Sequence, residues 1–327
     1  MIGAQPHLGF YVARRLLQAV PLVLGVLVIT FVLIHVAPGD PITILAGDGG
    51  DAAYYEEMRA RFGLDRPLPE QLVRYIAEVA RGNFGYSFRY QQPVYNVVFA
   101  HVPATLLLMG TALLLSTSLG LLLGTLAALR SRSPLDHSIT AGTSAIDAIP
   151  VFWLGQLLML AFAVKLGVFP IQGMRSVRYD YTGIRGVLDI LHHLALPALT
   201  LALAQLALIA RLTRTSLRQV LAEDFIRTAR AKGLAERMVL WRHALRNALL
   251  PIVTVIGGHI GVLLTGAALT ETIFAWPGLG RLLLDSVLSR DYPLIMAIFI
   301  LVSAMVVLAN LLTDLIYTLL DPRVRYD

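Results

Sequence analysis

Long apolar runs separated by shorter polar stretches dominate the chain. Six of these runs reach or approach the length of about 20 apolar residues that a helix needs to cross a bilayer core. They lie at residues 16–37, 104–129, 139–164, 195–210, 249–269 and 294–319. The pattern therefore predicts an all-α polytopic membrane protein with six transmembrane helices.

The composition agrees with a membrane location. Of the 327 residues, 57% are hydrophobic and only 15% are charged, whereas soluble domains carry about 25% charged residues. This composition excludes an ordinary soluble domain. The chain also has no cysteine, which excludes disulfides and thiolate metal sites.

The distribution of basic residues predicts the orientation, because Lys and Arg in short loops favour the cytoplasmic side. Residues 211–246 hold nine basic and three acidic side chains, and the loop at 38–103 holds six arginines and eight acids. The other segments expected inside carry basic pairs: Arg14 and Arg15, Arg130 and Arg132, Arg323 and Arg325. Both termini are then cytoplasmic, and the net charge of +6 lies on membrane-facing loops instead of a nucleic-acid-binding face.

These assignments divide one membrane domain into consecutive parts. The parts are a cytoplasmic N-terminus (1–15), a first transmembrane helix (16–37), an extracytoplasmic loop (38–103), a transmembrane core (104–319) with a cytoplasmic loop at 211–248, and a cytoplasmic tail (320–327). Within the outer loop, residues 51–64 and 69–82 have helix-like sequences with terminal signals. A second outer piece is expected at 166–194.

Sequence signatures of the common membrane hydrolases are missing. A phosphate-binding loop needs Gly-Lys-Ser/Thr, but the two lysines, Lys165 and Lys232, follow Val164 and Ala231. Neither a His-Glu-x-x-His zinc helix nor a Gly-x-Ser-x-Gly elbow occurs. We therefore expect a non-enzymatic chain without its own cofactor or metal, driven by a partner or by an ion gradient.

One polar segment carries the signals of a short cytoplasmic helix. In "EDFIRTARAKGL", residues 223–234, two acids come first and Gly233 stands at the C-terminal stop. The small side chains of Ala229 and Ala231 would let a partner surface approach. Charge for an acidic partner would come from Arg227, Arg230 and Lys232. The alternative interpretation is that these bases act only as positive-inside topology signals.

The same segment carries a family resemblance. "RTARAKGL" followed by "HALRNALLP" resembles the cytoplasmic loop through which permease subunits of bacterial ATP-binding cassette (ABC) importers, of the dipeptide/oligopeptide/nickel branch, dock onto their ATPases. "HVAPGDP", "GLDRP", "GNFGYSF" and "TETIFAWPGLGRLLLDSVLSRDYPLI" extend the resemblance over essentially the full length. One departure is that Arg-Thr-Ala at 227–229 replaces the general Glu-Ala-Ala before Gly233, a pattern similar to the peptide branch.

The resemblance implies a type I ABC importer permease architecture in the bacterial cytoplasmic membrane. It implies a large extracytoplasmic loop after the first helix and a coupling helix between helices four and five, with the ATPase-coupling residues Arg227, Thr228, Ala229, Arg230, Ala231, Lys232, Gly233 and Leu234. The implied partners are a second homologous permease, two cytoplasmic ATPases that bind ATP and Mg, and an extracytoplasmic binding protein that delivers di- or oligopeptides. A nickel chelate, glutathione or haem is an alternative cargo. From another class, a gradient-driven secondary transporter remains an alternative, although its typical inverted repeat is not evident.

Polar residues inside the predicted spans are candidates for function, because a carboxylate at membrane depth costs at least about 2.5 kcal/mol. Asp147 is the candidate for the translocation pathway, with a contact to the second permease as the alternative. Asn310 and Asp314 share a helix face, which predicts an interhelical polar contact. We expect Gln156, Gln205 and His259 to be polar groups at helix interfaces rather than substrate ligands. A metal site at His192 and His193 would need a third ligand, which the sequence does not identify.

Overall fold

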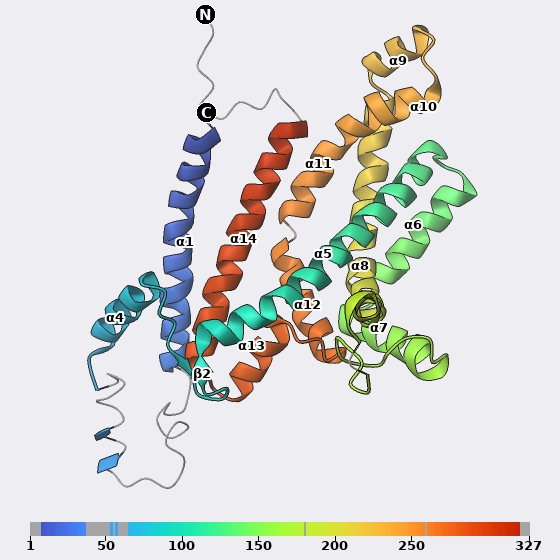
Figure 1. Ribbon diagram of the computed structural model, residues 1–327. Helices are drawn as coiled ribbons and strands as arrows, with labels where there is room; N and C mark the ends of the chain where they lie inside the picture. The colour runs from blue at the N-terminus through green and yellow to red at the C-terminus, as the bar shows by residue number, and fades with distance from the viewer. Residues whose placement is uncertain are drawn as a thin grey trace, which may run out of the picture. The chain divides into compact units, whose positions relative to one another are not determined.

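A computed structural model describes residues 8–36, 53–54, 56–57, 65–179, 181–258 and 260–320 (Figure 1). The described residues are almost entirely helical, as predicted. They fall into two compact units, one formed by residues Met1–Pro103 and Leu282–Leu308 and the other by Ala104–Arg281 and Ala309–Asp327. Each unit is described by itself.

The first unit contains the N-terminal helices and a small hairpin. Its elements are α1 (Leu8–Val36), α4 (Leu68–Ala80), β1 (Tyr86–Ser87), β2 (Gln92–Pro93), the start of α5 (Val94–Leu129), and parts of α13 (Leu279–Leu288) and α14 (Tyr292–Leu320). Two prolines open α4, as the sequence at 69–82 predicts for a helix. The other predicted helix of this loop, 51–64, lies mostly outside the described residues.

The hairpin is held by a buried carboxylate. The antiparallel strands pair Tyr86 with Pro93 and Ser87 with Gln92. Asp291, only 1% exposed, accepts hydrogen bonds from Ser87 Oγ at 2.5 Å and from the backbone N–H of Arg89 at 3.2 Å. The side chains of Ser87 and Asp291 thus have hydrogen-bond partners within the first unit.

The second unit holds the middle of the chain. Its complete elements are α6 (Pro134–Asp147), α7 (Val151–Leu158), the π-helical segment η1 (Met159–Lys165), α8 (Gly183–Leu221), α9 (Asp224–Ala231), α10 (Glu236–Met238), the π-helical segment η2 (Val239–Ala244), α11 (Leu245–Gly258) and α12 (Ile260–Ile273). Most of α5 and the ends of α13 and α14 also belong to it.

Two glycines allow α5 and α8 to pack closely. A Cβ added to Gly120 would lie 2.6 Å from a side-chain carbon of Ile209, and one added to Gly124 would lie 2.5 Å from the carbonyl oxygen of Ala210. This Gly-x-x-x-Gly spacing places both glycines on one face of α5, as in small-residue helix contacts of membrane proteins. The backbone of α8 therefore fits against α5 only where α5 has no side chain.

The third predicted span is not one straight helix. Residues 139–164 were expected to form a single crossing, but α6 and the α7–η1 segment meet at an angle of 101°. Pro150 stands at the N-cap of α7 with φ −55°. Proline lacks the N–H that would continue the α6 hydrogen bonds and disfavours helical geometry in the preceding residue, so the helix breaks here.

Helix lengths support a membrane protein. Among the described residues, three helices are long and apolar enough to cross a membrane alone: Val94–Leu129, Gly183–Leu221 and Tyr292–Leu315. The bent pair of α6 with α7–η1 would make a fourth crossing, and α1 contributes the shorter apolar stretch Leu17–Leu33. The fifth predicted run corresponds to α11 and α12.

Candidate functional site

The helix α9 is anchored on the core of the second unit. Ile226 is fully buried and Ala229 is 6% exposed, and both belong to a hydrophobic cluster with Leu217 of α8 and Ala248 of α11. Figure 1 shows α9 and α10 at the ends of these two helices. The burial of Ala229 differs from its expected exposure to a partner: its small side chain instead lets α9 approach the chain's own core.

A left-handed turn ends α9. Gly233 has φ +75°. Its N–H donates to the carbonyl of Arg230 at 2.9 Å, and the N–H of Leu234 donates to the carbonyl of Ala229 at 3.4 Å. These are the two hydrogen bonds of a Schellman motif, whose left-handed residue is usually glycine. The geometry explains why a glycine stands at position 233.

The exposed side of α9 is charged, but its arginines have acidic neighbours within the chain. Arg227 donates to Asp224 at 3.2 Å, and Arg230 donates to both carboxylate oxygens of Glu236 at 2.8 and 3.3 Å. Exposed pairs of this kind contribute only about 0–1 kcal/mol, so a partner carboxylate could displace them. Of the other predicted coupling residues, Leu234 is half-buried, and four are exposed: Thr228, Ala231, Lys232 and Gly233.

Asp147, the predicted pathway residue, is the last residue of α6 and lies beside the helix break. Its carboxylate accepts a hydrogen bond from Nη2 of Arg211 on α8 at 3.2 Å. The two side chains are 47% and 58% exposed. The structure therefore brings Asp147 together with a basic partner that sequence reasoning did not identify.

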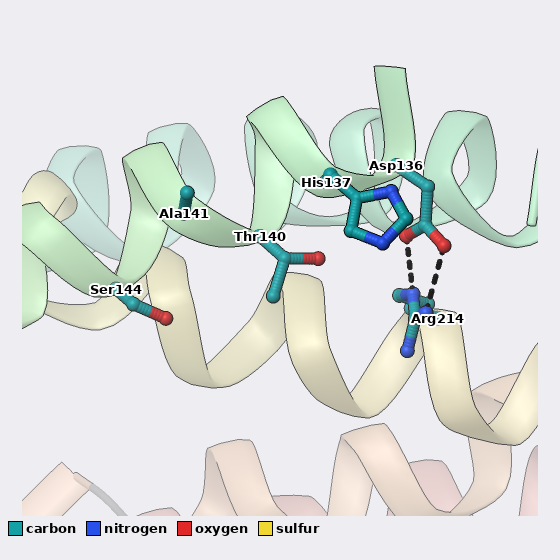
Figure 2. Close-up of a pocket in the computed structure, with 6 residues that line it drawn as sticks. All are labelled: Asp136, His137, Thr140, Ala141, Ser144 and Arg214. Carbon is teal, nitrogen blue, oxygen red and sulfur yellow. Dashed lines mark hydrogen bonds and ion pairs between the residues drawn. The ribbon is translucent and has the colours of Figure 1, made fainter. Parts of the chain in front are cut away.

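A second ion pair joins the same two helices near the start of α6 (Figure 2). Asp136, 2% exposed, accepts hydrogen bonds from Nε and Nη2 of Arg214 at 2.5 and 2.8 Å, and from the backbone N–H of Arg132 at 2.9 Å. Its own N–H donates to Ser133 Oγ at 3.3 Å, which caps the helix. Ser133-Pro134 is a recognisable helix start, but no local signal connects it to Arg214.

An open pocket of about 340 Å³ lies beside this pair. It is lined by Asp136, His137, Thr140, Ala141, Ser144 and Arg214. Figure 2 shows that all but Arg214 lie along α6. The pocket is therefore mainly an open groove along one helix, with the ion pair at one end.

Glu271 organises the loop between α12 and α13, a role that the sequence did not reveal. This fully buried carboxylate accepts hydrogen bonds from Thr105 Oγ1 at 2.7 Å and from the backbone N–H groups of Gly280 and Arg281 at 2.7 and 3.1 Å. Thr105 Oγ1 in turn accepts from the N–H of Leu279 at 2.7 Å. The loop thus lies over a fully hydrogen-bonded acid.

The other polar residues singled out in the sequence differ in their exposure and in their hydrogen-bond partners. Asn310 is exposed and Asp314 is half-buried, one turn apart on α14. His192 contacts the carbonyl of Val168 at 2.8 Å, and His193 contacts the carbonyl of Asp189 at 2.8 Å. Gln156 is exposed, Gln205 is half-buried, and His259 lies outside the described residues. Within the described ranges, no group of three or more His, Asp and Glu side chains could hold a metal ion.

Comparison with known proteins identifies a family over nearly the whole chain. A family model described as "Binding-protein-dependent transport system inner membrane component" matches residues 120–326. A model of the N-terminal part of such membrane components matches residues 8–109.

Similar curated proteins are permease proteins of transport systems. The chain is 41% identical to the di/tripeptide transport system permease protein DppB of Pseudomonas aeruginosa, over 97% of this chain and 98% of that protein. It is 39% identical to the oligopeptide transport system permease protein AppB of Bacillus subtilis, over 97% and 99%. It is also 41% identical to the glutathione transport system permease protein GsiC of Escherichia coli, over 97% and 99%.

The fold is also similar to a solved ABC transporter structure. A chain of the inward-facing MetNI methionine ABC transporter aligns with a TM-score of 0.56 at 17% identity, over 69% of this chain and 96% of that chain. At this identity the likeness concerns the fold alone. The family matches and the apolar helices describe a multi-pass inner membrane protein. This chain belongs to the family of binding-protein-dependent transport system inner membrane components.

Proposed function

We propose that this chain is the permease subunit of an ATP-driven ABC importer that takes up di- or oligopeptides. The observation that carries the proposal is α9: a short helix with Ile226 and Ala229 packed on α8 and α11, and with Arg227, Thr228 and Arg230 on its exposed side. A helix held in this way transmits a push from a docked protein to the helices on which it packs, because packed interiors deform little.

The proposed assembly contains two related permeases, two cytoplasmic ATPases with ATP and Mg, and an extracytoplasmic binding protein. In it this chain crosses the membrane six times, with both termini cytoplasmic and α9 facing an ATPase. The charge distribution of the loops supports this orientation. ATP hydrolysis belongs to the partner subunits.

The proposed peptide cargo rests on the relatives named for peptides. A permease named for glutathione has similar identity, and glutathione is itself a modified tripeptide with ammonium and carboxylate groups. The shared chemistry is a small zwitterionic peptide. The relatives named above include none named for a nickel chelate or haem.

Purification of the tagged chain from its native membrane in mild detergent tests the assembly. We expect a related permease and cassette ATPases to co-purify, and the reconstituted complex to accumulate Ala-Ala in liposomes when ATP and the binding protein are present. Recovery of the chain alone, with peptide uptake that follows an ion gradient and ignores ATP, would support the secondary-transporter alternative instead.

A cysteine cross-link tests the coupling role directly, because the chain has no native cysteine. Thr228→Cys on α9 is expected to cross-link to an engineered cysteine on the ATPase. The control is Val177→Cys, at a position that is 104% exposed and lies in the predicted outer segment. Equal cross-linking from both positions, or none from Thr228→Cys, would contradict the coupling assignment.

A further inference from the structure

A row of polar side chains runs along one face of α6. His137, Thr140, Ser144 and Asp147 are separated by three, four and three residues, a spacing that places side chains on one helix face. All four residues are exposed. Figure 2 shows the first three in a row, beside the Asp136–Arg214 pair. This polar row is continuous from the pocket to the break at the end of α6.

Lipid is an unfavourable neighbour for such a face. Charged side chains within membrane-spanning segments usually face the protein interior or a water-filled cavity. Asp147 lies inside the third predicted span, yet it is 47% exposed, and Arg211, directly after the fourth predicted span, is 58% exposed. Non-helical backbone at membrane depth likewise occurs only where it is covered by protein or lines water, and the helix breaks next to Asp147 at an angle of 101°. The polar row therefore faces protein or water in the membrane.

The charges at the break match the two ends of a peptide. Asp147 ends α6, where the helix dipole adds partial negative charge, and both attract a cation. Arg211 comes from α8 and presents a guanidinium that binds carboxylates well. An ammonium group and a carboxylate group would thus find complementary partners on adjacent helices.

Resting on the proposed importer function, we propose that the polar row of α6 lines the substrate path, and that the Asp147–Arg211 pair opens to bind the two charged ends of a zwitterionic peptide. In the structure the paired atoms are 3.2 Å apart. An extended dipeptide spans about 7 Å, so the pair must separate before the peptide binds between them. Exposed ion pairs are weak, and the long Arg211 side chain can move aside.

Thiol labelling of the assembled complex in nanodiscs tests whether the row meets water. Single cysteines are introduced at Thr140 and Ser144, with Gly142→Cys as the matched control. Gly142 is two residues from Ser144 and hence about 200° around the helix, and a Cβ there would meet nothing within 4 Å. We expect the two row cysteines to react with a trimethylammonium methanethiosulfonate about tenfold faster than Gly142→Cys, because reaction requires a hydrated thiolate.

The second readout is protection by peptide. Ala-Ala should slow the labelling of Ser144→Cys, whereas its N-acetylated and C-amidated analogue should not. Adding Asp147→Asn or Arg211→Gln should abolish this protection. Equal protection by the capped analogue, or protection that survives both substitutions, would refute the role of the ion pair.

The outcome separates this inference from the proposed function. Suppose that the wild-type complex imports Ala-Ala with ATP, but Ser144→Cys does not react with the methanethiosulfonate and instead cross-links to the second permease. The row is then a subunit interface, and the inference is wrong. If the wild-type complex shows no ATP-driven uptake, the proposed importer function itself fails.

Discussion

Gly233 closes α9 in a backbone conformation that other residues adopt at a cost. Its φ of +75° is left-handed, and a Cβ added there would meet nothing within 4 Å. Gly233→Ala should therefore destabilise the end of α9 by about 1–2 kcal/mol through the backbone alone. Gly233→Asn should cost less, because asparagine tolerates this conformation.

The measurement for Gly233 is ATP hydrolysis stimulated by the loaded binding protein, in complexes with equal ATPase content. We expect stimulation to decrease in the order glycine, asparagine, alanine. If alanine matches the wild type while asparagine does not, the left-handed turn is irrelevant to coupling.

We expect the side chain of Glu271 to contribute strongly to the stability of the protein. Glu271→Ala would leave the partly buried N–H groups of Gly280 and Arg281 without their acceptor, at a cost of up to about 1–3 kcal/mol for each unsatisfied group. Glu271→Gln retains one oxygen for them and should be milder. Thermal unfolding of each purified variant in detergent measures its loss of stability. An alanine variant as stable as the glutamine variant would argue against the hydrogen-bonded loop.

At the scale of elements, the contact between α5 and α8 depends on Gly124. Gly124→Ala would place a Cβ 2.5 Å from the carbonyl oxygen of Ala210, and backbone cannot move aside as a flexible side chain can. We expect a loss of stability of about 1–3 kcal/mol, as for other overpacked contacts. The matched control is Gly110→Ala on the same helix, where an added Cβ meets nothing within 4 Å.

Detergent-resistance assays on the two α5 variants give the comparison. Gly110→Ala should unfold at the wild-type temperature or slightly above it, because alanine favours helix. A similar loss in both variants would mean that the close approach of α8 does not limit substitution at Gly124.

At the scale of the whole molecule, the proposed topology predicts which positions share a side of the membrane. Val177→Cys should react with an impermeant maleimide in intact spheroplasts, and Thr228→Cys should react only after the membrane is opened. The physical basis is the excess of basic residues at 211–246, nine against three acids. Labelling of Thr228→Cys in sealed spheroplasts would reverse the proposed orientation.

The sequence by itself determined the class of the protein and the place of the short helix that we propose as its coupling segment. Apolar runs predict membrane helices because a bilayer requires long uninterrupted apolar length, and the glycine stop at position 233 is a local signal that the Schellman geometry explains. These features depend on neighbours within a few residues. A proline such as Pro150 is likewise a local signal that a helix can break, but the angle of 101° came only from the structure.

Only the tertiary structure decided which distant residues meet. Asp147 with Arg211, Asp136 with Arg214, and Glu271 with Thr105 are separated by 64, 78 and 166 positions in the chain, so no helical or turn periodicity connects them. The inward position of Ala229 was missed for a similar reason, since a small residue in a short helix suits either a partner or the chain's own core. Side-chain partners across helices follow from how the helices pack, and that packing depends on interactions from the entire unit at once.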